Sequence, residues 1–332
     1  MMWYNNKGKE DDVCVSTRIR LARNVSGICF APKYTDAEAL QIANDVKNAL
    51  SDKGFEFLNL DNAPELNRMA LVEDHMISPE MTKGKNKSVI IDDAGETSIM
   101  IGEEDHIRLQ VIHAGLDLYG AYKKASELDD AIAKKVSYAY HDTYGFLTKC
   151  PTNAGTGLRA SVMLYLPAIK MAGRMNALVG EVGKMGLTFR GVYGEGSNSK
   201  GDMYQLSNQI TLGIDEQSII EKLENITNQI IKTEREIREH IYKTNKDELT
   251  DKIYRAYGTL KYAKKMTSSE CSELLSTIKL GVCLKVLPQD CAQKINELII
   301  TTEPAHISLK KGENLSADER DKYRAQVVNE SI

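Results

Sequence analysis

The sequence predicts an α+β protein, in which an antiparallel β-sheet flanked by helices is followed by an all-helical C-terminal part. Apolar and polar residues alternate in several short segments before residue 215, which is typical of strands that bury one face. After Asp215, isoleucine and leucine recur every three or four positions along a stretch of about thirty residues, as in a long helix. We therefore expect a mixed domain over residues 1–215 and a helical domain over residues 216–332.

The overall composition is that of a soluble globular chain. Of its 332 residues 42% are hydrophobic and 27% charged, and the net charge of -4 gives no basic field that would attract nucleic acid. No apolar run approaches the roughly 18 residues of a membrane span, and the start of the chain lacks the apolar core of a signal peptide. Six cysteines lie far apart without a CxxC pair, which argues against a zinc site or a disulfide framework. We expect a cytoplasmic protein with no nucleic-acid partner, no membrane contact and no metal site of its own.

The first predicted strand, VCVSTRIRLAR at residues 13–23, alternates cleanly. One face carries Arg18 and Arg20 beside Cys14 and Ser16, while the other face is mainly apolar. Taken alone, the segment could be a solvated edge strand with cationic side chains. Two arginines side by side also suit phosphate oxygens, which each guanidinium can grip with two donors.

A helix is expected next, from the capping box formed by Thr35 and Glu38 to about Gly54, covering one face of the sheet. Residues 62–87 show no regular pattern. A hairpin then turns near Gly95, and its second strand is expected to run straight through GEEDHIRLQVI, with Glu104, His106 and Arg108 on one face. Three consecutive acidic residues are poor strand formers, and such a conflict is expected at a functional site.

Residues 116–148 are expected to form two helical pieces leading to CPTNAGTGLRASVMLYLP at residues 150–167. Its glycines permit a turn that a ligand can approach closely, and Arg159 opens the polar face of the strand that follows. The segment GTGLRA also fits a dinucleotide-binding fingerprint, but that fingerprint needs a strand before it and a helix after it. A helix at 168–185, a strand at 187–192 with Arg190, a glycine-rich loop and a further strand complete the mixed domain.

Five arginines, at positions 18, 20, 108, 159 and 190, lie on these strand-like segments. One antiparallel sheet can present them all on one face, where they would repel one another unless an anion held them. Chance placement on a solvated surface is the alternative, although the chain has 30 lysines and only 13 arginines. A triphosphate with its magnesium ion is the natural anion, because phosphoryl transfer needs such positioning and charge neutralisation.

The motifs STRIRLAR, GEEDHIR, CPTNAGTGLR and RGVYGEGS resemble the four signatures of the phosphagen (guanidino) kinases, in matching order and approximate spacing. Three departures from the family pattern, Thr17, Gly102 and Ala154, remove no charged or nucleophilic group. The resemblance implies the guanidino-kinase fold over residues 1–215 and the transfer of a phosphoryl group from ATP, with Mg²⁺, to a guanidine.

The resemblance also implies roles for individual residues. The substrate guanidinium would be held by Glu104 and Glu195 near Cys150, the active-site cysteine of the family. Carboxylates suit this role because a guanidinium, with a pKa above about 12, must be oriented and must lose a proton as its nitrogen attacks phosphorus. The implied ATP-binding residues are Ser16, Thr17, Arg18, Ile19, Arg20, His75, Arg108, Arg159, Ala160, Ser161, Val162, Met163, Arg190, Gly191, Val192, Tyr193, Gly194 and Glu195.

Within this family, the segments ASVMLYLPA, YQLSNQITLGIDE and RDKYRA are similar to the bacterial protein-arginine kinases. This likeness implies that exposed arginines of proteins are the substrates, that the product marks stress-damaged proteins or repressors for a Clp-type AAA+ protease, and that an activator protein takes part. It also implies an allosteric phosphoarginine site in a last helix that begins with a capping box at Ser316, although the same spacing fits a solvated basic face. The residues of that site are Arg320, Asp321, Lys322, Tyr323, Arg324 and Ala325, the last small enough to leave room for a ligand beside the backbone.

Two other functions stay open at this point. A kinase of free arginine or another small guanidino compound is disfavoured because STRIR begins at residue 16, so the helical domain that precedes this strand in such kinases is not expected. A catalytically inactive module that binds phosphoarginine is disfavoured because Glu104, Glu195 and Cys150 are all present. The long isoleucine stripe after Asp215 predicts a self-complementary face and hence a homodimer.

Overall fold

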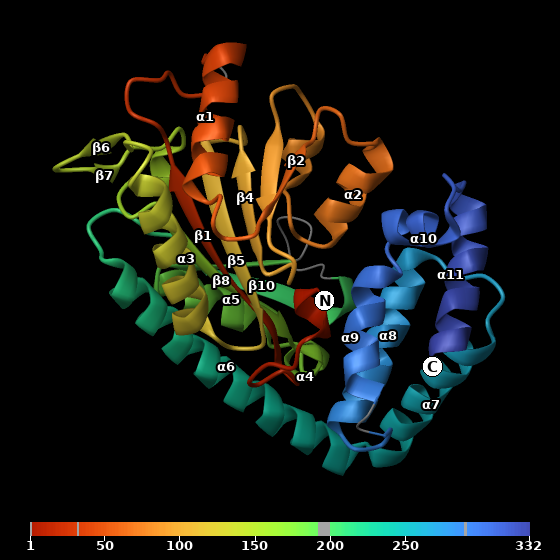
Figure 1. Cartoon of the computed structure of the whole chain (residues 1–332). Helices are drawn as coiled ribbons and strands as arrows, with labels where there is room; N and C mark the ends of the chain where they lie inside the picture. The colour runs from red at the N-terminus through yellow and green to blue at the C-terminus, as the bar shows by residue number, and fades with distance from the viewer. Residues whose placement is uncertain (1, 32, 192–199, 289–290) are drawn as a thin grey trace.

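An antiparallel sheet of eight strands, in the order β2-β3-β4-β5-β1-β8-β10-β9, lies at the centre of the molecule (Figure 1). The computed structural model describes residues 2–31, 33–191, 200–288 and 291–332. The sheet strands are β1 (Cys14–Arg23), β2 (Glu56–Asn59), β3 (Ser88–Ile91), β4 (Thr97–Ile101), β5 (Ile107–Ala114), β8 (Leu158–Tyr165), β9 (Leu187–Gly191) and β10 (Met203–Asn208). The fold class expected from the alternating segments is confirmed.

Helices cover the apolar face of the sheet and form one core with it. They are α1 (Asp36–Ala49), α3 (Leu118–Ala133), α4 (Pro167–Met171), α5 (Met175–Lys184) and α6 (Glu216–Thr244). Ile19 and Leu21 of β1 and Leu109 and Val111 of β5 point into this core, as their alternation predicted. The opposite face of the sheet, which carries the polar side chains of β1, is therefore free of these helices.

The long helix α6 belongs to the sheet rather than to the helical domain. Its isoleucine stripe, including Ile219, Ile226 and Ile230, is buried in the same core as the strands. The packing thus places the boundary between the two parts near Asn245, one helix later than the boundary at residue 215 expected from the sequence. Because the stripe is covered within the chain, it does not form the free surface from which a homodimer was predicted.

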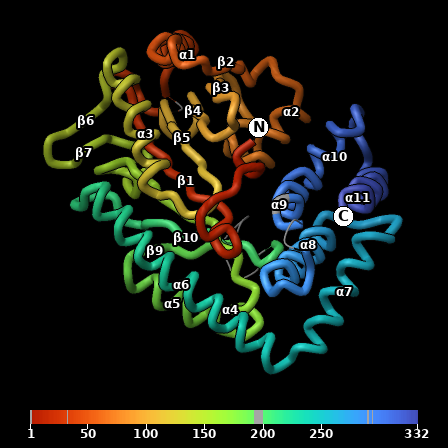
Figure 2. The backbone as a smooth tube through the Cα atoms, turned by 60° about the horizontal axis from the view of Figure 1, so that its bottom comes forward, coloured from red at the N-terminus to blue at the C-terminus, as the bar shows by residue number. Residues whose placement is uncertain are grey.

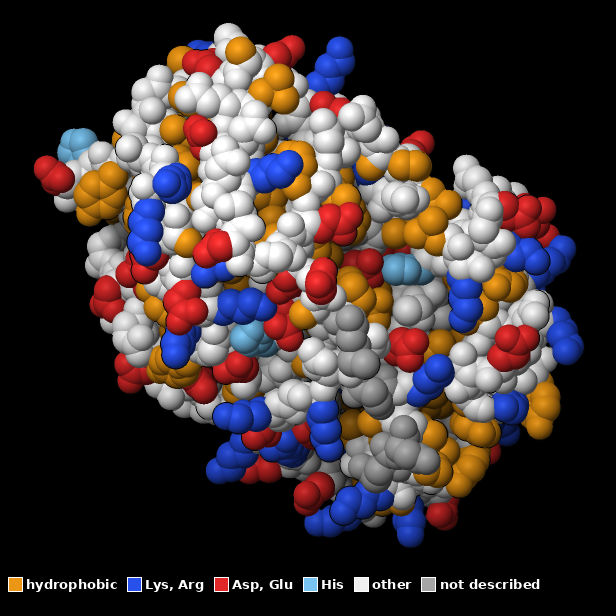
Figure 3. All heavy atoms as spheres, in the orientation of Figure 1, with side chains coloured by type: hydrophobic (Ala, Val, Ile, Leu, Met, Phe, Trp, Pro, Cys, Tyr) orange, Lys and Arg blue, Asp and Glu red, His pale blue; other side chains and the backbone are white. Residues whose placement is uncertain are grey.

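The C-terminal helices form a separate bundle around a second core. They are α7 (Lys246–Tyr262), α8 (Ser268–Cys283), α9 (Cys291–Thr301), α10 (Pro304–Lys311) and α11 (Ala317–Ser331). None of the helices in the described part of the chain is long and apolar enough to cross a membrane. Figure 3 shows basic and acidic side chains mixed over this face of the molecule, without a large area of one sign.

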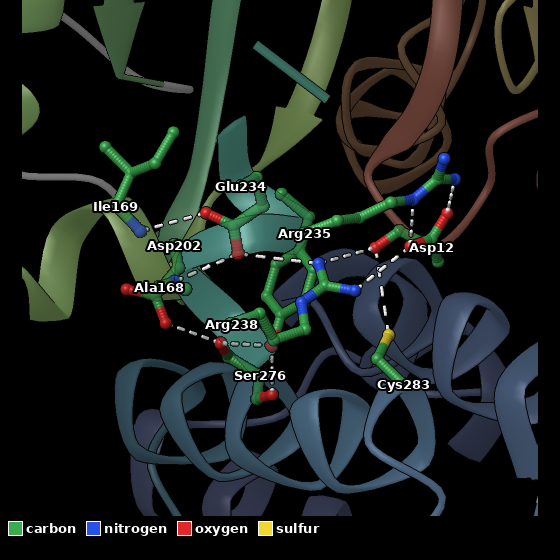
Figure 4. A network of polar contacts seen from close by, with 10 residues as sticks. Asp12, Ala168, Ile169, Asp202, Glu234, Arg235, Arg238, Ser276 and Cys283 are labelled. Carbon is green, nitrogen blue, oxygen red and sulfur yellow. Dashed lines mark hydrogen bonds and ion pairs between the residues drawn. The ribbon is translucent and has the colours of Figure 1, made fainter. Parts of the chain in front are cut away.

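A buried polar network joins α6 to the start of the chain (Figure 4). Arg238 donates to the carboxylate of Asp12 at 3.0 Å and to that of Glu234 at 3.4 Å. Glu234 is fully buried and accepts hydrogen bonds from the backbone N–H groups of Ala168 and Ile169 at 3.0 and 2.9 Å, which caps α4. Burial raises the pKa of Glu234 to about 6, although these partners favour its charged form. The network fixes α6 against the N-terminal segment and α4.

The C-terminal bundle is bonded directly to the sheet part. The hydroxyl of Ser276 on α8 donates to the carboxylate of Asp202 at 2.6 Å, just before β10 (Figure 4). The hydroxyl of Tyr165, at the end of β8, donates to the carbonyl of Ser276 at 2.6 Å. Lys200 forms an ion pair with Glu303, which precedes α10. The bundle is therefore tied to the residues that lead into β10.

Local structure departs from the sequence prediction in four places. The strand expected through GEEDHIR is broken, because Gly102 turns with a φ of 80° and separates β4 from β5. The second helical piece before residue 148 is a small hairpin of β6 (Tyr140–His141) and β7 (Gly145–Phe146). Gly173, with a φ of 68°, divides the helix expected at 168–185 into α4 and α5. The stretch without a pattern contains α2 (Glu65–Glu73).

Candidate active site

The five arginines lie on one face of the sheet. Residues directly opposite each other in an antiparallel pair point to the same side, and Arg20 on β1 lies opposite Arg159 on β8 and Gln110 on β5. Arg18 and Arg108 share that side because each is two residues from one of these positions. Arg190 on β9 joins them through its partner on β10, which lies opposite Met163 on β8. The register therefore brings together what the sequence predicted.

This face carries strong positive charge. Burial lowers the pKa of Arg18 to about 10, and the charge of Arg108 adds to the effect. The pKa of Arg20 is lowered by burial and by the charges of its arginine neighbours, and that of Arg159 by burial and by Arg190 and Arg108. Among the described residues, buried guanidinium nitrogens of Arg20 (Nε and Nη2) and of Arg159 (Nε) have no hydrogen-bond partner. Clustered guanidinium groups with unsatisfied N–H donors are typical of a site that binds an anion.

The acidic loop between β4 and β5 carries three consecutive carboxylates, of which two are buried and bonded within the protein and one is exposed. Glu103 is buried and forms an ion pair with Arg108. Asp105 is also buried, and it accepts hydrogen bonds from the side-chain amide of Asn24 at 2.6 Å and from the backbone N–H of Lys149 at 2.8 Å. These two carboxylates hold the loop in place beside the arginine face.

Glu104 is the one exposed member of this acidic triplet. Desolvation and the negative charges of Asp105 and Glu103 raise the pKa of Glu104, even though Arg108 opposes the shift. A carboxylate with a raised pKa is a better proton acceptor. The fixed neighbours thus present Glu104 as a free base next to the cationic face.

Cys150 lies beside this loop at the start of the short helix η3 (Pro151–Asn153). It is half-buried, and its Sγ is 2.9 Å from the Oγ1 of Thr152. The residue before it is bonded to Asp105, which joins the cysteine turn to the acidic loop. The turn requires Gly155, whose φ is 103°, since a Cβ there would lie 2.2 Å from the carbonyl oxygen of Thr211.

Of the other predicted ATP-binding residues, some lie on the arginine face of the sheet and others point into the core on the opposite face. Ser16, Ser161 and Met163 share the arginine face, and His75 lies next to it. The side chains of Ile19, Ala160 and Val162 are buried in the core on the opposite side, where Thr17 also lies, bonded to the carbonyl of Gly115 at 2.8 Å. Residues 161–163 pair with β1 on one side and β10 on the other, and the backbone N–H of Ala160 donates to the side-chain oxygen of Asn208 at 2.8 Å. The backbone of residues 160–163 is therefore engaged within the sheet region rather than facing a ligand. Gly191 ends β9, and Val192, Tyr193, Gly194 and Glu195 lie outside the described residues.

Comparisons with known proteins agree over nearly the whole chain. Residues 39–237 match the family described as "ATP:guanido phosphotransferase, C-terminal catalytic domain", and residues 246–332 match the "Protein-arginine kinase McsB C-terminal domain". The protein-arginine kinase of Halothermothrix orenii is 41% identical over 98% of this chain and 95% of its own length. That of Bacillus subtilis is 40% identical over 99% of this chain and 93% of its own length. This chain belongs to the protein-arginine kinase family.

Solved structures of two other kinases share the fold of this protein-arginine kinase family member. Lombricine kinase superposes with a TM-score of 0.61 and 24% identity, over 70% of this chain and 68% of its own. The duplicated taurocyamine kinase of Schistosoma mansoni gives a TM-score of 0.62 and 24% identity, over 80% of this chain and 40% of its own. At this level of identity the likeness concerns the fold alone.

The motif RDKYRA of α11, expected to bind phosphoarginine in the protein-arginine kinase family, is largely closed here. Arg324 is only 1% exposed, and it donates to the carbonyls of Thr302 and Met266 at 2.8 and 2.9 Å and to the carboxylate of Asp321 at 2.6 Å. Ala325 is fully buried, so it does not leave the predicted room beside the backbone. Burial in the second core overrides the open i,i+4 pair that the sequence suggested.

The outer residues of this motif are more accessible. Arg320 is half-buried and donates to the carbonyl of Leu315 at 2.6 Å. Lys322 is exposed and pairs with Asp318, and Tyr323 packs against a small apolar cluster between α10 and α11. Only this outer side of the motif can meet a ligand without rearrangement.

Two residues that support the site were missed from the sequence. Glu103 stands next to Glu104 and is equally acidic, and only its ion pair with Arg108 shows that it fixes the loop rather than the substrate. Asn24 follows the last arginine of β1 and bonds to Asp105 and to the backbone of His106. The position of Asn24 at the end of an arginine-bearing strand was the available signal.

Proposed function

We propose that this protein transfers the γ-phosphoryl group of ATP to arginine side chains of other proteins. The observation that carries the proposal is the face of five arginines, on which Arg20 and Arg159 keep unsatisfied donors, beside the exposed carboxylate of Glu104. The names of the relatives and the match of the C-terminal residues to the protein-arginine kinase domain support a protein substrate over free arginine.

In the proposed reaction, the arginine face binds the phosphates and neutralises charge on the transferred group. Glu104, together with Glu195, holds the substrate guanidinium and accepts the proton that its nitrogen loses. The N–P bond forms as the bond from phosphorus to the ADP oxygen breaks. Cys150, next to the acidic loop, helps to orient the guanidinium.

Mg²⁺ is expected to accompany ATP and to neutralise phosphate charge. Among the described residues, no group of three acidic, histidine or cysteine side chains is placed to hold a metal ion. Magnesium commonly keeps several waters and binds phosphate oxygens with few protein ligands. We expect the ion to enter with the nucleotide, bound through its phosphate oxygens.

The decisive experiment incubates the protein with Mg-ATP and an arginine-rich protein, and detects phosphoarginine by mass spectrometry under conditions that preserve acid-labile N–P bonds. Glu104→Gln should lower the rate by about 10²- to 10⁴-fold, the usual contribution of a positioned base, while ATP affinity stays within twofold. Free L-arginine should be a poor substrate. Normal turnover by Glu104→Gln, or efficient use of free arginine, would overturn the proposal.

Regulation and biological role follow from the same family likeness. We include in the proposal a cytoplasmic role in the stress response, an activator protein, and delivery of marked proteins to a Clp-type AAA+ protease. Phosphoarginine is proposed to bind α11 through its outer residues Arg320 and Lys322, because Arg324 and Ala325 are occupied internally. Arg320→Ala should abolish activation by added phosphoarginine without changing ATP affinity, and an unchanged response would exclude this site.

A further inference from the structure

A narrow pocket lies where the arginine face meets the C-terminal helices. On the sheet side it is lined by Ser16 and Met163, which face each other across β1 and β8, and by His75. Trp3, near the N-terminal end of the chain, forms a further side. Aromatic and apolar walls with few polar groups are typical of a small-molecule site.

This pocket continues the arginine face. Ser16 is two residues before Arg18 on the same strand, so the two side chains project from the same face about 7 Å apart. Burial and the charge of Arg18 lower the pKa of His75 to about 3, which keeps the imidazole uncharged at neutral pH. A ligand with its phosphates on Arg20 and Arg159 can therefore place its uncharged end in this pocket.

The opposite wall comes from the C-terminal bundle. Ile299 and Ile300 at the end of α9, Ser272 on α8 and Glu303 before α10 line the pocket. All four fall within the residues matched to the protein-arginine kinase C-terminal domain and outside those matched to the guanido phosphotransferase domain. Figures 1 and 2 both show the N-terminal end of the chain beside α9.

The aromatic residues of the pocket are held by contacts that cross between the two parts. The indole Nε1 of Trp3 donates to the carbonyl of Asp74 at 3.0 Å. The carboxylate of Asp74 accepts from the hydroxyl of Tyr4 at 3.3 Å and is 2.9 Å from the Nε2 of His306 on α10. These contacts hold Trp3 in place, and its ring lies with its centroid 6.1 Å from that of His75.

We propose that the C-terminal domain supplies one wall of the pocket for the adenine base, so that ATP binds to both domains at once. The inference rests on the proposed function, because it takes ATP as the phosphoryl donor. A purine is flat, uncharged and aromatic, and it packs well against rings, methionine sulfur and branched aliphatic side chains. Ser272 and the Lys200–Glu303 pair are the polar groups at the rim that can meet its edge nitrogens.

The test compares the affinities of ATP and of inorganic tripolyphosphate, by calorimetry on the full chain, for three variants. Tripolyphosphate carries the charge of ATP without the base. Ile299→Ala and Ile300→Ala should each weaken ATP about tenfold, since each removes methylene groups from the base contact, and should leave tripolyphosphate unchanged. Ile295→Ala, on the same helix but buried in the second core, is the matched control and should leave both affinities unchanged in the folded protein.

Equal weakening of both ligands by the pocket variants, or no weakening of either, would overturn the inference, and so would equal affinities of the unaltered protein for ATP and tripolyphosphate. Failure of the unaltered protein to bind either ligand would instead overturn the proposed function. Thermal unfolding of the same variants in the absence of ligand checks that all three are compared in the folded state.

Discussion

Arg20 and Arg324 place the same guanidinium in two different settings. Arg324 is buried in the C-terminal bundle, and its donors meet the carbonyls of Thr302 and Met266 and the carboxylate of Asp321. Arg20 lies among like charges, its pKa is lowered, and two of its nitrogens have no partner among the described residues. The guanidinium of Arg324 is bonded within the fold, whereas that of Arg20 keeps buried donors that an anionic ligand could accept.

The two environments also differ in their effect on the stability of the folded protein. Clustered arginines with unsatisfied donors, as at Arg20 and Arg159, are expected to lower the stability of the protein in the absence of a ligand. The contacts of Arg324 instead replace the hydrogen bonds that its guanidinium loses on burial. Substitution should therefore affect stability in one region and ligand affinity in the other.

The largest effect is expected for Arg324→Ala. It leaves Asp321 and two buried carbonyls without their donor, so the free energy of unfolding should fall by about 3 to 5 kcal/mol, as when one partner of a buried pair is removed. Urea denaturation measures the loss, and ATP affinity of the folded fraction should change less than twofold. A loss below about 1 kcal/mol would show that these contacts behave like a surface ion pair.

Arg159→Ala should have the opposite profile. It removes charge-assisted contacts to phosphate worth about 1.5 to 3 kcal/mol, so the Kd for ATP should rise about ten- to 150-fold. The free energy of unfolding without ATP should stay constant or increase, because a repelling charge is removed. Arg255→Ala, at an exposed i,i+4 pair with Asp251, is the control and should change neither quantity appreciably. A marked loss of stability in Arg159→Ala would mean that the face is structural.

The smallest effect concerns the contact of α10 with α2. Burial lowers the pKa of His306, but its hydrogen bond to Asp74 and the charges of Asp74, Glu73 and Glu303 outweigh burial and raise the pKa above its ordinary value. The pair therefore stabilises the fold fully below the ordinary histidine pKa of about 6.5, and this contribution is lost as the pH rises through the raised value. His306→Gln should flatten the fall of unfolding free energy in this pH range. An unaltered slope would assign the pH dependence to other groups.

The alternation of apolar and polar residues predicted the strands of the sheet well, because one face of each strand packs in the core and the other carries polar side chains. It predicted that Arg18, Arg20 and Arg159 share a face, and the register confirms this. Alternation failed at the acidic loop, since a turn at Gly102 depends on backbone conformation and not on hydrophobic period. The roles of Glu103 and Glu104 could not be separated either, because the ion pair to Arg108 exists only after β4 and β5 have paired.

Helical periodicity predicted helices well but not what they pack against. The stripe of α6 was expected to form a dimer face, but it is buried against the sheet of the same chain. A stripe does not say whether it meets a sheet, a bundle or a second chain. Likewise the spacing of Arg320 and Arg324 places them near one face, while the burial of Arg324 depends on Thr302, directly after α9, and on the loop at Met266. Such tertiary neighbours are distant in sequence and leave no local pattern.

The burial of Arg324 also bears on self-phosphorylation, because the proposed substrate is an arginine side chain and the protein has arginines of its own. A guanidinium that is enclosed and donates to backbone carbonyls cannot turn a nitrogen toward a phosphorus atom. Of the 13 arginines, all of which are described, only Arg174, Arg190 and Arg255 are exposed. With lysine as the common surface cation, the chain exposes few arginines that a second copy of it could label.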